Sequence, residues 1–387
     1  MKALLRRPST YLGLPMLLAC AATLLTYDLP DGYLDGVLLL IAGAVAMLAL
    51  DALDALGGVR LPPFERFAVR EYAGTREALV AFAFCALVAV FCVLDLALFP
   101  IPLLDKPSAY AQMEGGREHI RHLSAWCWVL PPVGLLCVRN RGLRYAMVLA
   151  GIVFPILVID RNRIFASLFS VALVLVMRRK GGLRLPWPTV LLLGLVGAVL
   201  FAALGILRSG PLEGVTLPFG AFYSESPPGV KWLLLYLTAG PYNFASMLAK
   251  HYHNADFLLN QVVPLRGSIV TAGTGIPLDS PTINVGTEYF PFLLALGPAG
   301  AVAAMLGLYA MLVWSARRLC ASTSLFSLLI FLRMAYVAAM APFAPQAYTF
   351  MSAGFIALCL LMQLFAASLP DRRRAPFLMP RVDHHAS

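Results

Sequence analysis

Five arginines of this chain occupy positions from which they could bind a phosphate or another anion. Arg161 and Arg163 stand two residues apart in a turn between apolar runs, and Arg208 directly follows a later run. Arg266 lies in the segment Pro-Leu-Arg-Gly-Ser, and Arg333 lies inside an apolar run. Because a guanidinium offers paired N–H donors that match phosphate oxygens, these residues predict an anion-binding site.

The turn that holds Arg161 and Arg163 also has a structural interpretation. The apolar run before it, Tyr145–Ile159, has 15 residues. It would span about 22 Å as a helix, against a hydrocarbon core of roughly 30 Å. The turn is therefore expected to lie below the membrane surface. It forms either the floor of an anion site or a polar turn in which Asp160 pairs with one arginine and the other snorkels.

Arg333 lies well inside the run Ser324–Ala341, close to the middle of an expected membrane span. An arginine at that depth needs a charged partner or a water-filled cavity. It therefore predicts either a functional group or a structural ion pair. The acidic residue that could pair with it is Asp95, which also lies deep inside an expected membrane span.

His251, His253 and Glu288 are the candidate general bases, because an imidazole or a carboxylate can take a proton from a substrate hydroxyl. Glu288 could instead be a polar residue beside the aromatic belt of the membrane. His253 and Asp256 would share one face of a helix, but no convincing third ligand stands nearby. We therefore predict no metal site.

The composition requires a membrane protein. Of 387 residues, 60% are hydrophobic and 13% are charged, whereas a typical soluble chain has roughly a quarter charged residues. Ten apolar runs predict about ten transmembrane helices in one all-α, polytopic membrane domain over residues 1–387. They are Tyr11–Thr26, Gly36–Leu56, Ala78–Phe99, Leu123–Val138, Tyr145–Ile159, Ile164–Met177, Val190–Leu207, Pro291–Trp314, Ser324–Ala341 and Tyr348–Leu369.

The basic residues predict the orientation of these helices. If the N-terminus is cytoplasmic, 20 of the 30 lysines and arginines fall on the cytoplasmic side, as expected from the positive-inside rule. Both termini are then cytoplasmic, and residues 208–290 form a large, partly helical periplasmic loop between helices 7 and 8. Within it, Ala239-Gly240-Pro241 should break the apolar stretch 230–250 into two short interfacial helices. The net charge of +10 follows from topology and requires no nucleic acid.

Several familiar patterns are missing from the sequence. There is no GxxxxGKS phosphate loop, HExxH, GxSxG or outer DxD, which argues against nucleotide and zinc-hydrolase chemistry. There is no internal repeat of the kind from which many secondary transporters are built. The seven cysteines form neither a CxxC pair nor a disulfide framework in the polar loops.

Three stretches carry further information: Asp160-Arg161-Asn162-Arg163-Ile164-Phe165, Ile283-Asn284-Val285-Gly286-Thr287 and Leu296-Gly297-Pro298-Ala299-Gly300. With Arg208 at the start of one long outer loop, they resemble the O-antigen polymerase (Wzy) family of bacterial envelope polysaccharide polymerases. Members often show Asn-Val-x-Thr and then Asp-Phe-Gly-x-x-Gly at the loop exit. Here Ala295-Leu296 replaces the Asp-Phe, so the base would be Glu288 or a loop histidine.

The resemblance implies a GT-C-like, metal-independent glycosyltransferase of the bacterial inner membrane that needs no cofactor. It would join lipid-linked oligosaccharide repeat units on the periplasmic face. The glycan would leave undecaprenyl diphosphate and pass to a sugar hydroxyl, with Asn284 and Tyr289 as further substrate-binding residues. Membrane lipid and a chain-length regulator protein are the other expected partners. An O-antigen ligase, and a flippase or exporter of lipid-linked glycans, are the alternatives.

Overall fold

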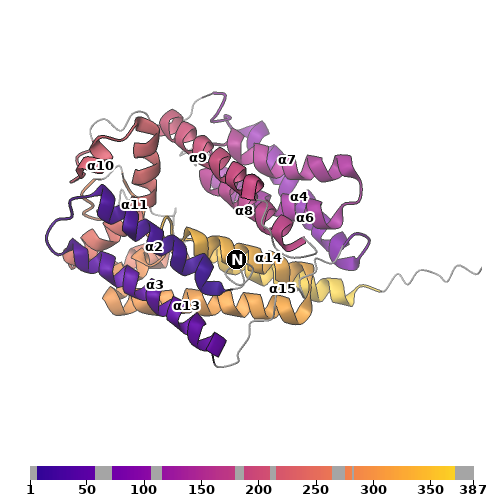
Figure 1. Ribbon diagram of the computed structural model, residues 1–387. Coiled ribbons are helices and arrows are strands. Elements are labelled where there is room, and N and C mark those ends of the chain that lie inside the picture. The colour runs from indigo at the N-terminus through magenta and orange to yellow at the C-terminus, as the bar shows by residue number, and fades with distance from the viewer. Residues whose placement is uncertain are drawn as a thin grey trace, which may run out of the picture.

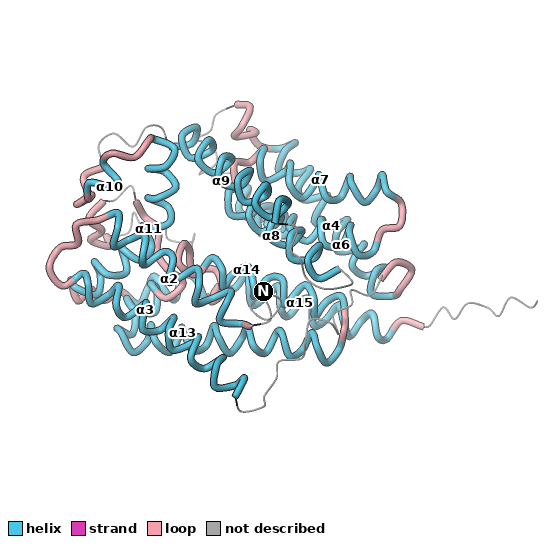
Figure 2. Tube along the Cα trace, viewed as in Figure 1, coloured by secondary structure: helices cyan, strands magenta, loops and turns pink. Residues whose placement is uncertain are grey.

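The structure, a computed structural model, describes residues 7–56, 72–105, 116–178, 187–209, 215–263, 275–280 and 283–370. These residues are almost entirely helical (Figures 1 and 2), and their only β contact is an isolated bridge between Tyr27 and Phe219. The elements are α2 (Pro8–Thr26), α3 (Tyr33–Leu56), α4 (Arg76–Leu98), α5 (Arg117–Ser124), η3 (Ala125–Val129), α6 (Leu130–Cys137), α7 (Arg141–Leu157), α8 (Arg161–Arg178), α9 (Trp187–Ser209), α10 (Ala221–Ser224), α11 (Pro228–Ala249), α12 (Ala255–Val262), α13 (Phe290–Ser322), α14 (Leu325–Met340) and α15 (Phe350–Ser368).

Five of these helices are long and apolar enough to cross a membrane. They are α2, α3 over Tyr33–Leu53, α4, α13 and α15. The prediction of an all-α, multi-pass membrane protein is thus confirmed at this level. The count of about ten spans and the orientation stay predictions.

The apolar run Leu123–Val138 does not form one regular α-helix, and its crossing of the membrane stays a prediction. It forms the last residues of α5, the 3₁₀ helix η3 and the short helix α6. Pro131 and Pro132 stand in the first turn of α6, where the missing proline N–H is tolerated. The backbone stays right-handed helical at Ser124 and Leu130, so the three short elements follow one another without a break.

Helix α14 forms the centre of the bundle. It packs against α2, α4, α8, α13 and α15, and all of its 16 residues are buried except Arg333 and Ala339. A helix that is apolar on all sides belongs in a protein interior, so α14 can be shorter than a lipid-exposed span. Its one arginine is therefore carried on a rigid, enclosed element.

The stretch 230–250 is also different from the prediction, because α11 is one helix of 22 residues with Pro241 inside it. Its second half is buried and packs on α2 and α3. A proline in a helix removes one hydrogen bond, which these tertiary contacts offset. A Cβ on Gly240 would lie 2.0 Å from the carbonyl oxygen of Pro342, so glycine serves close packing here and does not end the helix.

Helix α13 bends where the loop-exit stretch begins. Gly297 has φ 69° and ψ −164° inside the helix and is followed by Pro298. That backbone conformation is essentially open to glycine alone. The bend separates the first turns of α13, which border the candidate site, from the long remainder that runs beside α2 and α3 (Figure 1).

Candidate functional site

A hollow of about 380 Å³ lies where α8, α12, α13, α14 and α15 come together. Two of the predicted site residues, Asn284 and Arg333, line it, as does Asn162 from the turn between the two predicted arginines. We call this hollow the Arg333 pocket. Its lining is Asn162, Phe257, Gln261, Ile276, Leu278, Asn284, Val285, Gly286, Phe290, Arg333, Pro345, Gln346, Thr349, Phe350 and Met351.

Arg333 supplies the only charge in the described lining of this pocket. Its Nε donates a hydrogen bond of 3.3 Å to the hydroxyl of Ser352 on α15. Among the described residues, no ion pair joins Arg333 to a carboxylate. The guanidinium therefore brings to the pocket wall a positive charge that no described carboxylate contacts directly.

The alternative that Asp95 pairs with Arg333 is wrong. Asp95 is fully buried, and its carboxylate meets Nε of Arg117 at 3.0 Å and Nε of Arg121 at 3.6 Å. Both arginines come from α5 and lie between the apolar runs Ala78–Phe99 and Leu123–Val138. Because α5 packs on α4, local arginines satisfy Asp95.

A pair of side-chain amides forms a polar part of the pocket wall. Asn162 Nδ2 donates to Gln346 Oε1 over 3.3 Å, and Gln346 Nε2 donates to Asn162 Oδ1 over 3.0 Å. The hydroxyl of Tyr336 donates to the backbone oxygen of Asn162 at 2.7 Å and also to its side-chain oxygen. Fixed neutral amides of this kind suit sugar hydroxyls and phosphate oxygens. Sequence reasoning missed Gln346, which no motif marks.

The predicted arginines beside Asn162 have partners within the protein. Arg163 Nε meets Asp160 Oδ2 at 2.7 Å, and its Nη1 donates to Ser124 Oγ at 3.3 Å. The guanidinium of Arg161 lies over the ring of Tyr236 with 5.5 Å to the centroid. The structural interpretation of this turn therefore accounts for Arg163, and the contribution of the turn to the pocket is Asn162.

Glu288 lies beside the Arg333 pocket but does not line it. Its oxygens accept from the backbone N–H groups of Gln346 (2.6 Å), Ala347 (3.0 Å) and Tyr348 (3.2 Å). Burial raises the pKa of Glu288 from 4.5 to about 7, although these N–H donors and Arg333 favour the ionised form. The geometry makes Glu288 the support of the turn that carries Gln346, and contact with an acceptor hydroxyl would require that support to open.

The predicted histidines lie on the exposed connection between α11 and α12. His251 and His253 are both exposed, and His251 has φ 49°. A Cβ on Gly297 would lie 3.9 Å from Cε1 of His253, so His253 borders the bend of α13. In the part of the chain that the structure describes, no three His, Cys, Asp or Glu side chains form a group that could hold a metal.

The three remaining predicted residues are not brought to the pocket by described contacts. Tyr289 is fully buried in the core. Arg208 stands in the last turn of α9, with its side chain outside what is described. Arg266 lies outside the described residues.

Asp279 is the centre of a polar cluster that the sequence reasoning missed. Its Oδ2 accepts from the hydroxyls of Tyr33 (2.9 Å), Tyr242 (2.8 Å) and Ser246 (3.3 Å), and Lys250 Nζ lies 2.5 Å from Oδ1. Burial acts to raise the pKa of Asp279, but the hydrogen bonds from Lys250 and the two phenols outweigh it and hold the pKa below its ordinary value. The cluster ties segment 275–280, which contributes two residues to the pocket wall, to α3 and α11.

Comparison of the chain with protein-family models, with curated proteins and with solved structures gives no match. A functional assignment must therefore rest on the chemistry of the residues around the Arg333 pocket.

Proposed function

We propose that this protein is a metal-independent glycosyltransferase that polymerises lipid-linked oligosaccharide repeat units, and that the Arg333 pocket receives the diphosphate of the donor. The observation that carries the proposal is one arginine, on an otherwise apolar helix, lining a hollow whose other described polar groups are neutral. A cation in such surroundings is costly unless an anion or water meets it. A diphosphate would supply that negative charge.

The pocket has groups suited to both ends of such a donor. As the bond between the sugar C1 and the diphosphate breaks, negative charge grows on the leaving oxygen. A fixed guanidinium in a low-dielectric site stabilises that charge. The amides of Asn162 and Gln346 can bond sugar hydroxyls, and Phe257, Phe290 and Phe350 give the pocket apolar faces for a sugar ring or the start of the lipid.

The acceptor hydroxyl attacks C1 and must lose its proton. Neither a carboxylate nor an imidazole is among the described lining residues, so the proton acceptor must come from outside this lining. Both oxygens of Glu288 are occupied by backbone N–H groups. We therefore assign this step to His251 or His253, which are exposed on the connection to α12.

The proposal places the protein in the bacterial inner membrane with the Arg333 pocket on the periplasmic side, as the distribution of basic residues predicts. The expected partners are an undecaprenyl-diphosphate-linked oligosaccharide, the surrounding lipid and a chain-length regulator protein.

The test is to delete the gene and examine the surface polysaccharide by gel electrophoresis. Loss of a polymerase should leave single repeat units attached to lipid A core. Loss of a ligase should leave none attached, and loss of a flippase should trap units on the cytoplasmic leaflet. Long chains that persist without the gene would refute the proposal.

The pocket is tested by returning variants to the deletion strain. Arg333→Gln should abolish long chains, and Arg333→Lys should restore only part of them because lysine lacks the bidentate geometry. Arg141→Gln is the matched control, since Arg141 is exposed at the start of α7, away from the pocket. Normal polymer from Arg333→Gln would refute the role of the pocket.

A further inference from the structure

A second hollow, of about 830 Å³, follows the last turns of α13 and is closed on one side by Gln363 of α15. We call it the α13 groove. Its lining is Tyr309, Ala310, Val313, Trp314, Arg317, Arg318, Ala321, Ser322 and Gln363. Phe290, at the other end of the same helix of 33 residues, lines the Arg333 pocket. Because α13 bends at Gly297, only its remainder, Pro298–Ser322, is one straight stretch, about 37 Å long. The Arg333 pocket borders the first turns before the bend, and the α13 groove follows the last turns after it.

The chemistry of the α13 groove changes along the helix. Tyr309, Ala310 and Val313 give its first part an apolar and aromatic wall. One turn further, Arg317 and Arg318 give it two positive charges, and its described lining includes no acid. The groove thus combines an apolar slot with a cationic end.

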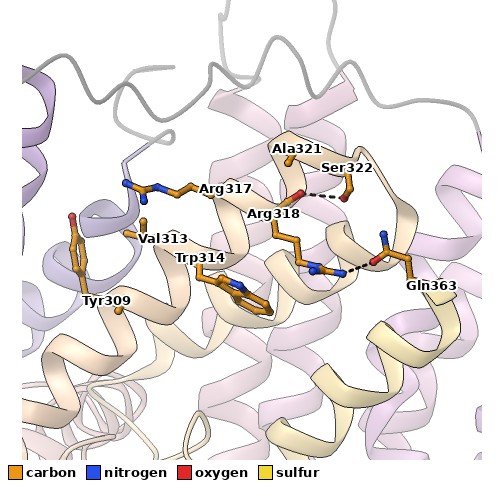
Figure 3. A pocket seen from close by; sticks show the side chains of 9 residues that line it. Tyr309, Val313, Trp314, Arg317, Arg318, Ala321, Ser322 and Gln363 are labelled. Carbon is orange, nitrogen blue, oxygen red and sulfur yellow. Dashed lines mark hydrogen bonds between the residues drawn. The ribbon is translucent and has the colours of Figure 1, made fainter.

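Arg318 is held in place by neutral groups. Its Nη2 donates to Gln363 Oε1 over 2.7 Å, and its guanidinium lies over the ring of Trp314 with 5.8 Å to the centroid. Its Nε is buried and has no hydrogen-bond partner among the described residues. Figure 3 shows Arg318 reaching toward Gln363, while exposed Arg317 leaves the helix in another direction. Among the described residues, therefore, one of the two guanidinium groups is oriented and neither forms an ion pair with a carboxylate.

We propose that the α13 groove binds the headgroup of an anionic phospholipid, with the phosphate at Arg318 and an acyl chain along Tyr309 and Val313. The apolar part of the groove continues directly from the cationic part. A lipid would contact both parts, whereas a free inorganic anion would contact the cationic part alone. Trp314 has the amphipathic character of residues at the headgroup level. Basic residues near that level attract anionic lipids, and each contributes about fivefold in binding.

The test uses the full-length protein in detergent and phospholipids with brominated acyl chains, which quench tryptophan fluorescence on contact. Brominated phosphatidylglycerol should reach half-maximal quenching at a concentration at least about fivefold lower than brominated phosphatidylcholine. Trp314→Phe should remove this lipid-dependent component. Equal quenching by the two lipids would overturn the proposal.

Variants identify the groups that bind the headgroup. Arg318→Gln and Arg317→Gln should each raise the half-maximal concentration of phosphatidylglycerol about fivefold, whereas Arg141→Gln, the control, should leave it unchanged. Arg317 is exposed, so Arg317→Gln tests the charge even if Arg318→Gln disturbs folding. An unchanged value in Arg317→Gln would overturn the proposal. Competition by glycerol phosphate as strong as that by the lipid would do the same, because the groove would then bind a soluble anion.

Discussion

Replacing Glu288 with glutamine should remove part of the pH dependence of the protein's stability. Glu288 is fully buried, and burial raises its pKa from 4.5 to about 7. Below pH 4.5 the carboxyl is protonated in both the folded and the unfolded protein. Between pH 4.5 and 7 the folded protein keeps a proton that the unfolded chain has lost, so stability falls as the pH rises through this window.

The magnitude follows from the two pKa values. Since a tenfold change in an ionisation constant corresponds to about 1.4 kcal/mol, the wild-type protein should lose about 3 kcal/mol of unfolding free energy from this group between pH 4.5 and pH 8. Glu288→Gln cannot titrate and should lack this loss. It should also be less stable than the wild type at pH 5 by about 1–3 kcal/mol, because its amide N–H groups face backbone N–H donors that the carboxyl accepted.

Denaturant titration of the purified protein in detergent, at several pH values, measures both effects. The curves for wild type and Glu288→Gln should approach each other as the pH rises. Glu225→Gln provides a control, because Glu225 is an exposed carboxylate and its loss should leave the wild-type slope. Parallel curves for wild type and Glu288→Gln across pH 4.5 to 8 would show that this proton is not coupled to folding.

Three further substitutions test the contacts that hold the site. Asp279→Asn should lower the unfolding free energy by about 1–3 kcal/mol in a denaturant titration, because it leaves a lysine and two phenols without their carboxylate. An unchanged unfolding free energy would refute a stabilising role for the Asp279 cluster. Gly240→Ala should lower the unfolding free energy by up to about 3 kcal/mol, because the added Cβ would lie 2.0 Å from a carbonyl oxygen. Gly354→Ala is the control and should not lower it, because no atom lies within 4 Å of the added Cβ. Equal yields of the two folded variants in gel filtration would contradict this difference. Asp95→Asn should cost about 3–5 kcal/mol by leaving two buried arginines uncompensated, and a thermal melting curve like that of the wild type would contradict the pairing.

The helices could be predicted from the sequence where apolar length alone decides. The run Ala78–Phe99 became α4, Arg76–Leu98, because its hydrophobic residues are continuous and Thr75 caps the helix start. The prediction failed where tertiary contacts override local signals. Pro241 suggested a break, yet α11 continues through it inside the bundle, and nothing in residues 230–250 indicates which surfaces will cover them.

The candidate site was predictable only where a residue stands out from its own segment. Arg333 is anomalous in its own segment, so the sequence alone marks it for attention. The three N–H donors of Glu288 stand 58 to 60 residues further along the chain, and a loop glutamic acid carries no sign of such partners. Asp279 was missed because its significance depends on hydroxyls from α3 and α11 that only folding brings to it.

The arginines of the apolar interior differ in what balances their charge. Arg117 and Arg121 share Asp95, and Arg163 has Asp160; these contacts offset much of the cost of burial and explain the residues as structural. Arg333 has a serine hydroxyl and, without direct contact, the buried Glu288, whose pKa is raised, so its burial is offset less completely within the described residues. Under the proposed function, the diphosphate of the donor supplies the negative charge that this cation lacks. This difference, and not the number of arginines, separates the Arg333 pocket from the other charged clusters.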